Sequence, residues 1–228
     1  MIKNKIFIFG DSCTTNLAGE YIWHNMPKLG VKDLIVDDIE FIFVWSTGKT
    51  AYSITKNGFN EMTDLLKINN KIIEKNDIVI LHFGGADFEF YFPFTNNLEK
   101  TINDYCEYSI KYFSQYTKNI SFFGLYPPSK KLADEVNKKN RTTANYELRF
   151  NCWLNTNNIL NTKSKEHNLP TPLSIAYDIF KQDEKILGIH TYDGIHLIDH
   201  VAIKVRKDLL QWVKETYKNI LIQQTRSG

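Results

Sequence analysis

The sequence predicts an α/β protein with three layers, α/β/α, in which helices cover both faces of a central, mainly parallel sheet of about five strands. Short β-branched and aromatic runs alternate along the chain with longer stretches of helical spacing, as in strand-helix-strand units. In addition, the run Ile78-Val79-Ile80-Leu81 is apolar at every position, which is typical of a strand covered on both faces. This run is therefore expected to be a central strand.

The other elements follow from the same patterns. Strands are expected at residues 5–9, 39–44, 77–83 and 119–125. Apolar residues at helical spacing predict helices near 17–26, 59–73, 102–113, 146–160 and 199–217. Pro127 and Pro128 must interrupt regular structure, so the lysine-rich stretch 129–140 is expected to be an exposed loop.

Length and charge limit the classes of function. A chain of 228 residues, 43% of them hydrophobic, is sufficient for one sizeable core, and we expect one domain over residues 1–225. Residues 226–228 lack apolar periodicity and are interpreted as a cloning remnant. Lysine and arginine number 28 against 26 acidic residues, so the net charge of +2 gives no support to nucleic-acid binding.

Cysteine usage and hydropathy indicate the compartment. The three cysteines, Cys13, Cys106 and Cys152, are few and widely spaced, which fits neither a disulfide framework nor a zinc site. No signal-peptide core is visible, and no apolar run approaches the roughly 20 residues that cross a bilayer. We therefore expect a cytoplasmic protein without a membrane span; the oligomeric state is left open, a homo-oligomer included.

The first candidate for chemistry is Gly10-Asp11-Ser12, directly after the first predicted strand. A glycine there allows a sharp turn, and a following helix N-terminus offers N–H groups that can hold an oxyanion. Ser12 is thus placed to attack a carbonyl. Taken alone, the tripeptide is equally compatible with an ordinary helix N-cap.

A second candidate lies near the other end, where Asp193 and His196 are separated by two residues just before the last predicted helix. A nucleophilic serine needs a base, and that base needs an acid to fix its tautomer. The Asp193-x-x-His196 loop can supply both groups. Its alternative interpretation is a turn, because Asp-Gly is a strong turn dipeptide.

Together the two motifs resemble the SGNH hydrolase superfamily, also called GDSL lipases and esterases, and its flavodoxin-like fold. The resemblance implies Ser12, Asp193 and His196 as a catalytic triad, and Gly48 as a backbone donor to the oxyanion. The superfamily's third block, Gly-x-Asn-Asp, corresponds to residues 84–87 and places Gly85 and Asp87 among the oxyanion or substrate-binding residues.

The third block departs from the superfamily pattern, because Ala86 stands where the asparagine is expected. Loss of one oxyanion donor typically costs about 10²–10³ in rate. Backbone N–H groups of Gly85 or Ala86 are candidate substitutes, whereas an ionised Asp87 has no proton to donate.

The resemblance implies a serine esterase without cofactor that cleaves small acyl esters, acetyl foremost, on a carbohydrate or glycan precursor. Two alternatives remain open: an O-acyltransferase that uses the same triad on a sugar, and an inactive glycan-binding protein that kept the fold. The substrate in each case is a small molecule or a glycan.

Other residues are further candidates for chemistry. His190, Asp193, His196 and His200 could form a metal site, but the triad explains two of them better, and no metal is expected. Cys13 could serve as a thiol nucleophile, although a free cysteine is more often a buried hydrophobe.

The aromatic segment 88–94, if extended, would place its phenylalanines on one face as a wall for an acyl chain or a stacking surface for sugar rings. Burial of these side chains in the core or at a subunit contact is favoured slightly.

Overall fold

A computed structural model describes residues 4–19, 27–128, 144–173, 197 and 199–221. Within these ranges, five strands form one sheet in the order β2-β3-β1-β4-β5. β1 pairs in parallel with β3 and β4, and β4 pairs in parallel with β5, whereas β2 is antiparallel to β3. The predicted mainly parallel sheet is confirmed. The strands span Asn4–Gly10 (β1), Leu29–Val36 (β2), Ile39–Ser46 (β3), Ile78–His82 (β4) and Asn119–Phe122 (β5).

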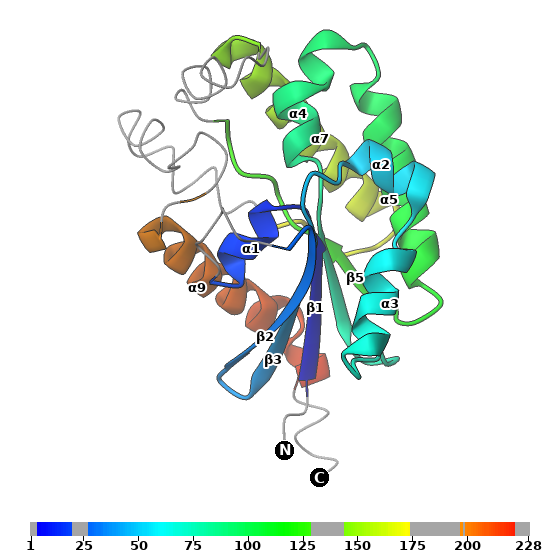
Figure 1. The fold of residues 1–228 in the computed structure, drawn as a ribbon, viewed down its shortest axis with the longest axis vertical. Helices are drawn as coiled ribbons and strands as arrows, with labels where there is room; N and C mark the ends of the chain where they lie inside the picture. The colour runs from blue at the N-terminus through cyan, green and yellow to red at the C-terminus, as the bar shows by residue number, and fades with distance from the viewer. Residues whose placement is uncertain (1–3, 20–26, 129–143, 174–196, 198, 222–228) are drawn as a thin grey trace.

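Helices cover both faces of the sheet, which confirms the three-layer α/β/α architecture (Figure 1). On one side lie α1 (Cys13–Leu17) and α9 (Asp199–Thr216); on the other lie α2 (Ala51–Asn57), α3 (Asn60–Ile68) and α5 (Leu98–Phe113). The helix α7 (Tyr146–Glu166) packs against α5, and α4 (Gly85–Phe90) leads into the short 3₁₀ helix η2 (Phe92–Phe94). None of the helices within the described ranges is long and apolar enough to cross a membrane.

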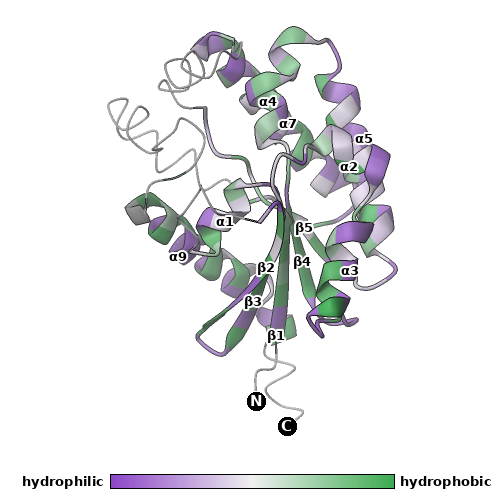
Figure 2. Cartoon of the chain, in the orientation of Figure 1, coloured by the Kyte–Doolittle hydropathy of each residue, from purple (hydrophilic) through white to green (hydrophobic). Residues whose placement is uncertain are grey.

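The core lies between the sheet and its helices. β4 runs between β1 and β5, and its residues Ile78 to Leu81 are at most 1% exposed, which confirms it as a central strand. Hydrophobic residues follow the strands, whereas the helices mix hydrophobic and hydrophilic residues (Figure 2). On one face Phe9, Phe59 and Phe113 pack ring against ring, with centroids 4.7–6.1 Å apart. Such aromatic clusters contribute heavily to the burial of apolar area.

Three local expectations differ from the structure. The helix expected at 17–26 begins earlier, at Cys13, and α1 ends at Leu17; residues 20–26 lie outside the described part. The strand β2 was not anticipated, because Lys32 and Asp33 interrupt its apolar pattern at the sheet edge. Segment 88–94 is helical rather than extended, so its phenylalanines do not share one face. Phe88 and Phe92, four residues apart, are buried as the favoured interpretation expects, whereas Phe94 is 54% exposed.

The strand register gathers the predicted site at one edge of the sheet. Gly10, the last residue of β1, is level with Trp45 of β3 and with His82 of β4. The carboxyl ends of these three parallel strands therefore lie side by side, which is where open α/β sheets bind ligands. The segments that leave these ends carry Ser12, Gly48 and Gly85.

Candidate active site

Ser12 lies in a tight turn between β1 and α1, where it is the N-cap of the helix. A Cβ on Gly10 would lie only 1.7 Å from Thr14 Oγ1 and 2.7 Å from the His82 carbonyl oxygen, so the turn has no room for a side chain. The Cys13 N–H donates to Asp11 Oδ1 at 2.8 Å, and the Thr14 N–H donates to the Asp11 carbonyl at 3.1 Å. Sequence and packing thus fix the backbone on both sides of Ser12.

Asp11 and His82 form a buried polar layer beneath this turn. Burial raises the pKa of Asp11 to about 7, although the Cys13 N–H acts in the opposite direction. Burial lowers the pKa of His82 to about 3, so its ring is neutral at physiological pH. The His82 Nδ1 lies 3.1 Å from Thr14 Oγ1, which gives the buried imidazole a partner on α1. His82 therefore supports the turn as a neutral group.

Gly48 lies in the connection between β3 and α2, as the superfamily resemblance implies. Its φ of +74° is left-handed, a conformation that glycine adopts without strain, and no atom lies within 4 Å of the position a Cβ would take. Neighbouring N–H groups are engaged, since Thr47 donates to Lys28 and Lys49 donates to Ser46. Gly48 thus faces open space with its backbone exposed.

Gly85 and Asp87 belong to α4, the helix that leaves β4. A Cβ on Gly85 would lie 3.3 Å from Asp11 Oδ2 and 3.9 Å from Cys13 Sγ, so the N-terminus of α4 lies against the Ser12 turn. The first N–H groups of a helix have no partner within the helix. Gly85 and Ala86 therefore present backbone donors at this place, while Ala86 offers no side-chain donor.

Asp87 is completely buried, and its carboxylate contacts the start of α2. The N–H of Ala51 donates to Oδ2 at 2.6 Å, and the N–H of Tyr52 donates to Oδ1 at 3.2 Å. Burial raises the pKa of Asp87 to about 6, whereas these two N–H groups act to lower it. The structure thus gives Asp87 a capping contact that ties α4 to the helix following Gly48.

The remaining triad candidates, Asp193 and His196, lie outside the described residues. Leu197, which follows His196 in the chain, is described and completely buried. Its carbonyl oxygen accepts a hydrogen bond of 3.3 Å from Nδ2 of Asn16, a fully buried residue of α1. Asn16 is four residues after Ser12, so both lie on one face of the helix. Sequence reasoning missed Asn16, because no local pattern distinguishes it from other α1 residues.

The metal alternative concerns residues outside the described part of the chain, whereas the thiol alternative concerns Cys13, which is described. His190, Asp193 and His196 of the proposed metal cluster lie outside the described residues, and the side chain of His200 is not described either. Cys13, Cys106 and Cys152 are free and buried. Cys13 is 6% exposed, as expected for a cysteine that packs as a small hydrophobe.

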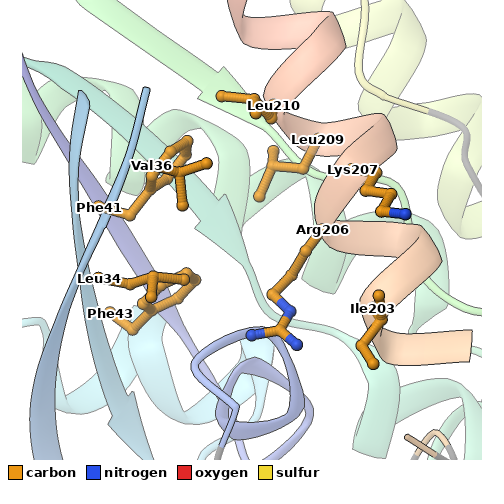
Figure 3. Close-up of a pocket in the computed structure, with 9 residues that line it drawn as sticks. All are labelled: Leu34, Val36, Phe41, Phe43, Ile203, Arg206, Lys207, Leu209 and Leu210. Atoms are coloured by element: carbon orange, nitrogen blue, oxygen red, sulfur yellow. The ribbon is translucent and has the colours of Figure 1, made fainter. Parts of the chain in front are cut away.

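An apolar cavity of about 250 Å³ lies away from these residues, between the β2–β3 hairpin and α9 (Figure 3). Its walls include Leu34, Phe41 and Phe43 from the strands, and Ile203 and Leu209 from the helix. Ser12, Gly48 and Gly85 do not line it. The cavity is therefore separate from the candidate active site.

The pKa of Asp11 leads to a prediction for pH-dependent stability. Because the folded-state pKa lies above the unfolded value of 3.8, ionised Asp11 destabilises the folded protein above about pH 7, and this cost diminishes as the pH falls toward 4. Asp11→Asn keeps an acceptor for the Cys13 N–H but has no charge. The melting temperature of the variant relative to wild type should therefore rise between pH 4 and pH 8 in thermal scans. A difference in melting temperature between variant and wild type that stays constant over this range would contradict the raised pKa of Asp11.

Comparison with known proteins supports the fold. The sequence matches no family model and no curated protein. Among solved structures, the acetylxylan esterase Axe2 from Geobacillus stearothermophilus matches with a TM-score of 0.60 at 13% identity, over 92% of this chain and 95% of that chain. A protein described as an SGNH hydrolase, from Slackia heliotrinireducens, matches with a TM-score of 0.56 at 12% identity, over 91% and 97% of the two chains. The chain has the SGNH hydrolase fold.

The fold shared with these structures is the one that the resemblance of the sequence motifs implies. The matched Axe2 structures include catalytic mutants that replace a serine, an aspartate and a histidine, the last two three positions apart. In the present chain the described parts of the SGNH hydrolase fold bring Ser12, Gly48 and Gly85 to the same sheet edge.

Proposed function

We propose that the protein is a serine esterase that cleaves small acyl groups, acetyl foremost, from a carbohydrate or glycan precursor. The observation that carries the proposal is the position of the Ser12 turn at the carboxyl end of β1, between the ends of β3 and β4, with the N-terminus of α4 packed against it. A serine in such surroundings has backbone donors nearby for a negatively charged oxygen.

In the proposed reaction, His196 takes the proton from the Ser12 hydroxyl as its oxygen attacks the ester carbonyl, and Asp193 orients the imidazole and stabilises its charge. The backbone N–H groups of Ser12 and Gly48 hold the resulting oxyanion. His196 then returns the proton to the departing sugar hydroxyl, which leaves an acyl group on Ser12. Water, deprotonated by the same histidine, hydrolyses this acyl-enzyme and releases the acid.

The N-terminus of α4 offers backbone N–H groups that can replace the side-chain donor of the missing asparagine. Gly85 packs on the Ser12 turn, so α4 begins beside Ser12 with the N–H groups of Gly85 and Ala86 in its first turn. We assign the third donor to one of these two N–H groups. A backbone donor needs no particular side chain at position 86, which is consistent with alanine there.

The hydrogen bond between Asn16 and Leu197 supports the assignment of His196 as the base. Asn16 donates to the carbonyl oxygen of Leu197, and the Cα atoms of neighbouring residues are 3.8 Å apart. The group bound by Asn16 therefore belongs to the residue directly after His196. Because Asn16 and Ser12 are one helical turn apart, this contact joins Leu197, the residue after His196, to the nucleophile's own helix.

The acyl group and the alcohol are inferred by analogy with the matched structures. These are named as acetylxylan and acetyl-xylooligosaccharide esterases, at 12–13% identity to this chain. The direct test is incubation of the protein with acetylated xylooligosaccharides, with released acetate measured enzymatically. Acetate release that depends on Ser12 supports the proposal, and its absence, together with inertness toward p-nitrophenyl acetate, rules out the esterase.

A second prediction concerns Asn16. Asn16→Leu removes the hydrogen bond to Leu197 and replaces the side chain with one of similar size. We expect kcat for p-nitrophenyl acetate to fall by about 10–100-fold at nearly unchanged KM, because small displacements of a catalytic group have effects of this size. Steady-state kinetics and a thermal melt of the same preparation separate misplacement from unfolding. A folded variant with wild-type kcat would show that Asn16 does not position the base.

An O-acyltransferase with the same triad is the second candidate, and the alanine at position 86 is the observation that favours it, since the oxyanion site differs from that of the superfamily pattern. Mass spectrometry of reactions with and without an added sugar acceptor separates the two. An acylated acceptor formed in preference to free acid would identify a transferase.

A further inference from the structure

A groove of about 470 Å³ lies between α2, α4 with η2, and α5, outside the Ser12 turn. We call it the tyrosine groove. It is lined by Tyr52 and Lys56 of α2, by Asp87 and Tyr91 of the α4 region, and by Asn97 and Asp104 at α5. Its volume lies within the range that is usual for small-ligand sites.

Two tyrosine side chains at this groove are exposed to an unusual degree. Tyr52 is 49% exposed and Tyr91 is 54% exposed, whereas Phe92 beside them is buried. A tyrosine combines a flat apolar ring with a hydroxyl that can donate or accept a hydrogen bond. Such residues provide rigid contact area at low entropic cost, and they suit ligands that have both C–H faces and hydroxyl groups. Sugar rings have this combination.

The charged groups of the groove already have partners. Lys100 donates to Asp104, and the Lys56 ammonium lies over the Tyr52 ring, 5.7 Å from its centroid. The Asp87 carboxylate accepts the N–H groups of Ala51 and Tyr52. An ionic ligand would therefore have to compete with these contacts, whereas a neutral polyhydroxylated ligand can use the hydroxyls and the Asn97 amide.

The groove is built on the two segments that also carry Gly48 and Gly85, although Ser12, Gly48 and Gly85 do not line it. Tyr52 is four residues after Gly48, and the α4 helix that carries Asp87 begins at Gly85, which packs on the Ser12 turn. A chain of sugars whose acylated unit is at Ser12 can thus extend along the same two helices.

We propose that the tyrosine groove binds the neutral oligosaccharide part of the acylated substrate, with Tyr52 and Tyr91 stacking against sugar rings. The proposal rests on the function proposed above for the location of the acyl group, but sugar binding itself requires no turnover. Within the aromatic segment 88–94, Tyr91 and Phe94 are equally exposed, but only Tyr91 lines the groove.

The test measures binding separately from catalysis. The Ser12→Ala protein is titrated by calorimetry with unacetylated xylohexaose, cellohexaose and mannohexaose. We expect at least one to bind, and Tyr91→Ala or Tyr52→Ala in the same background to weaken that binding about tenfold or more. Phe94→Ala is the matched control, because Phe94 is also 54% exposed and lies three residues from Tyr91 but does not line the groove. Its affinity should be unchanged.

The outcomes distinguish the two proposals. Failure of all three oligosaccharides to bind, or an equal loss from Phe94→Ala and Tyr91→Ala, overturns the groove assignment even if the protein hydrolyses p-nitrophenyl acetate. Binding that depends on Tyr52 and Tyr91 upholds it even if Ser12 has no esterase activity, in which case the chain is a glycan-binding protein. In an active enzyme, Tyr91→Ala should raise KM for acetylated oligosaccharides, whereas the control Phe94→Ala should leave both this KM and the hydrolysis of p-nitrophenyl acetate unaltered.

Discussion

Ser12→Ala is expected to lower the rate of p-nitrophenyl acetate hydrolysis by at least about 10³-fold, to near the background rate. The hydroxyl is the only group lost, and Gly10, Asp11 and the Cys13 N–H, which fix the backbone of the turn, are unchanged. The variant should therefore fold with a melting temperature close to that of wild type. Absorbance of released p-nitrophenolate gives the rate directly.

The adjacent thiol provides the control for this experiment. Cys13 is buried behind the turn, and Cys13→Ala should keep most of the activity because its backbone N–H to Asp11 is preserved. A fluorophosphonate probe should label the wild-type protein and the Cys13→Ala variant, but not Ser12→Ala. Equal hydrolysis rates for wild type and Ser12→Ala would remove Ser12 from the mechanism.

Arg149→Leu is expected to reduce the free energy of unfolding by about 3–5 kcal/mol, the typical cost of removing one partner of a buried ion pair. Arg149 on α7 donates to Glu89 Oε2 on α4 at 2.6 Å, and the two side chains are 1% and 4% exposed. Without the guanidinium, the Glu89 carboxyl would remain buried with its main partner lost. Urea denaturation followed by circular dichroism measures the change.

Two further variants test this explanation. The double replacement Glu89→Leu with Arg149→Leu should recover part of the stability, since no uncompensated charge then remains in the core. Lys67→Ala breaks the exposed pair with Asp64, in which both side chains are more than 60% exposed, and should lower the free energy of unfolding far less than Arg149→Leu does. An Arg149→Leu variant no less stable than Lys67→Ala would show that the buried pair contributes little.

The fold was largely predictable because its signals are local. The wholly apolar run at 78–81 identifies a central strand, and the glycine-aspartate-serine turn identifies the end of the first one. The edge strand β2 was missed because only one face of an edge strand meets the core, and its burial alternates irregularly along Leu29–Val36. The conformation of segment 88–94 could not be predicted, because a run with phenylalanines at alternate positions occurs both in extended chains and in helices. In the structure the segment is helical, and Phe88 and Phe92 are buried in the core.

The candidate site was predictable only in part. Ser12, Gly48 and Gly85 follow strand ends, so a motif in the sequence was enough to indicate them. The contacts that hold these residues in place join distant segments: Asn16 to Leu197, Glu89 to Arg149, and Asp87 to Ala51. A single sequence contains no signal for such pairs, because each partner alone is an ordinary residue of its helix. Asp193 and His196 remain predictions.

The contact of Asp87 with the start of α2 has a consequence for how this protein can be altered. The two segments that present Gly48 and Gly85 are joined by one carboxylate that accepts N–H groups of Ala51 and Tyr52. They form a single module rather than two interchangeable loops. An engineer who exchanges the segment after β3 for that of another hydrolase must therefore keep two backbone N–H groups within reach of Asp87, or this buried carboxylate loses its donors.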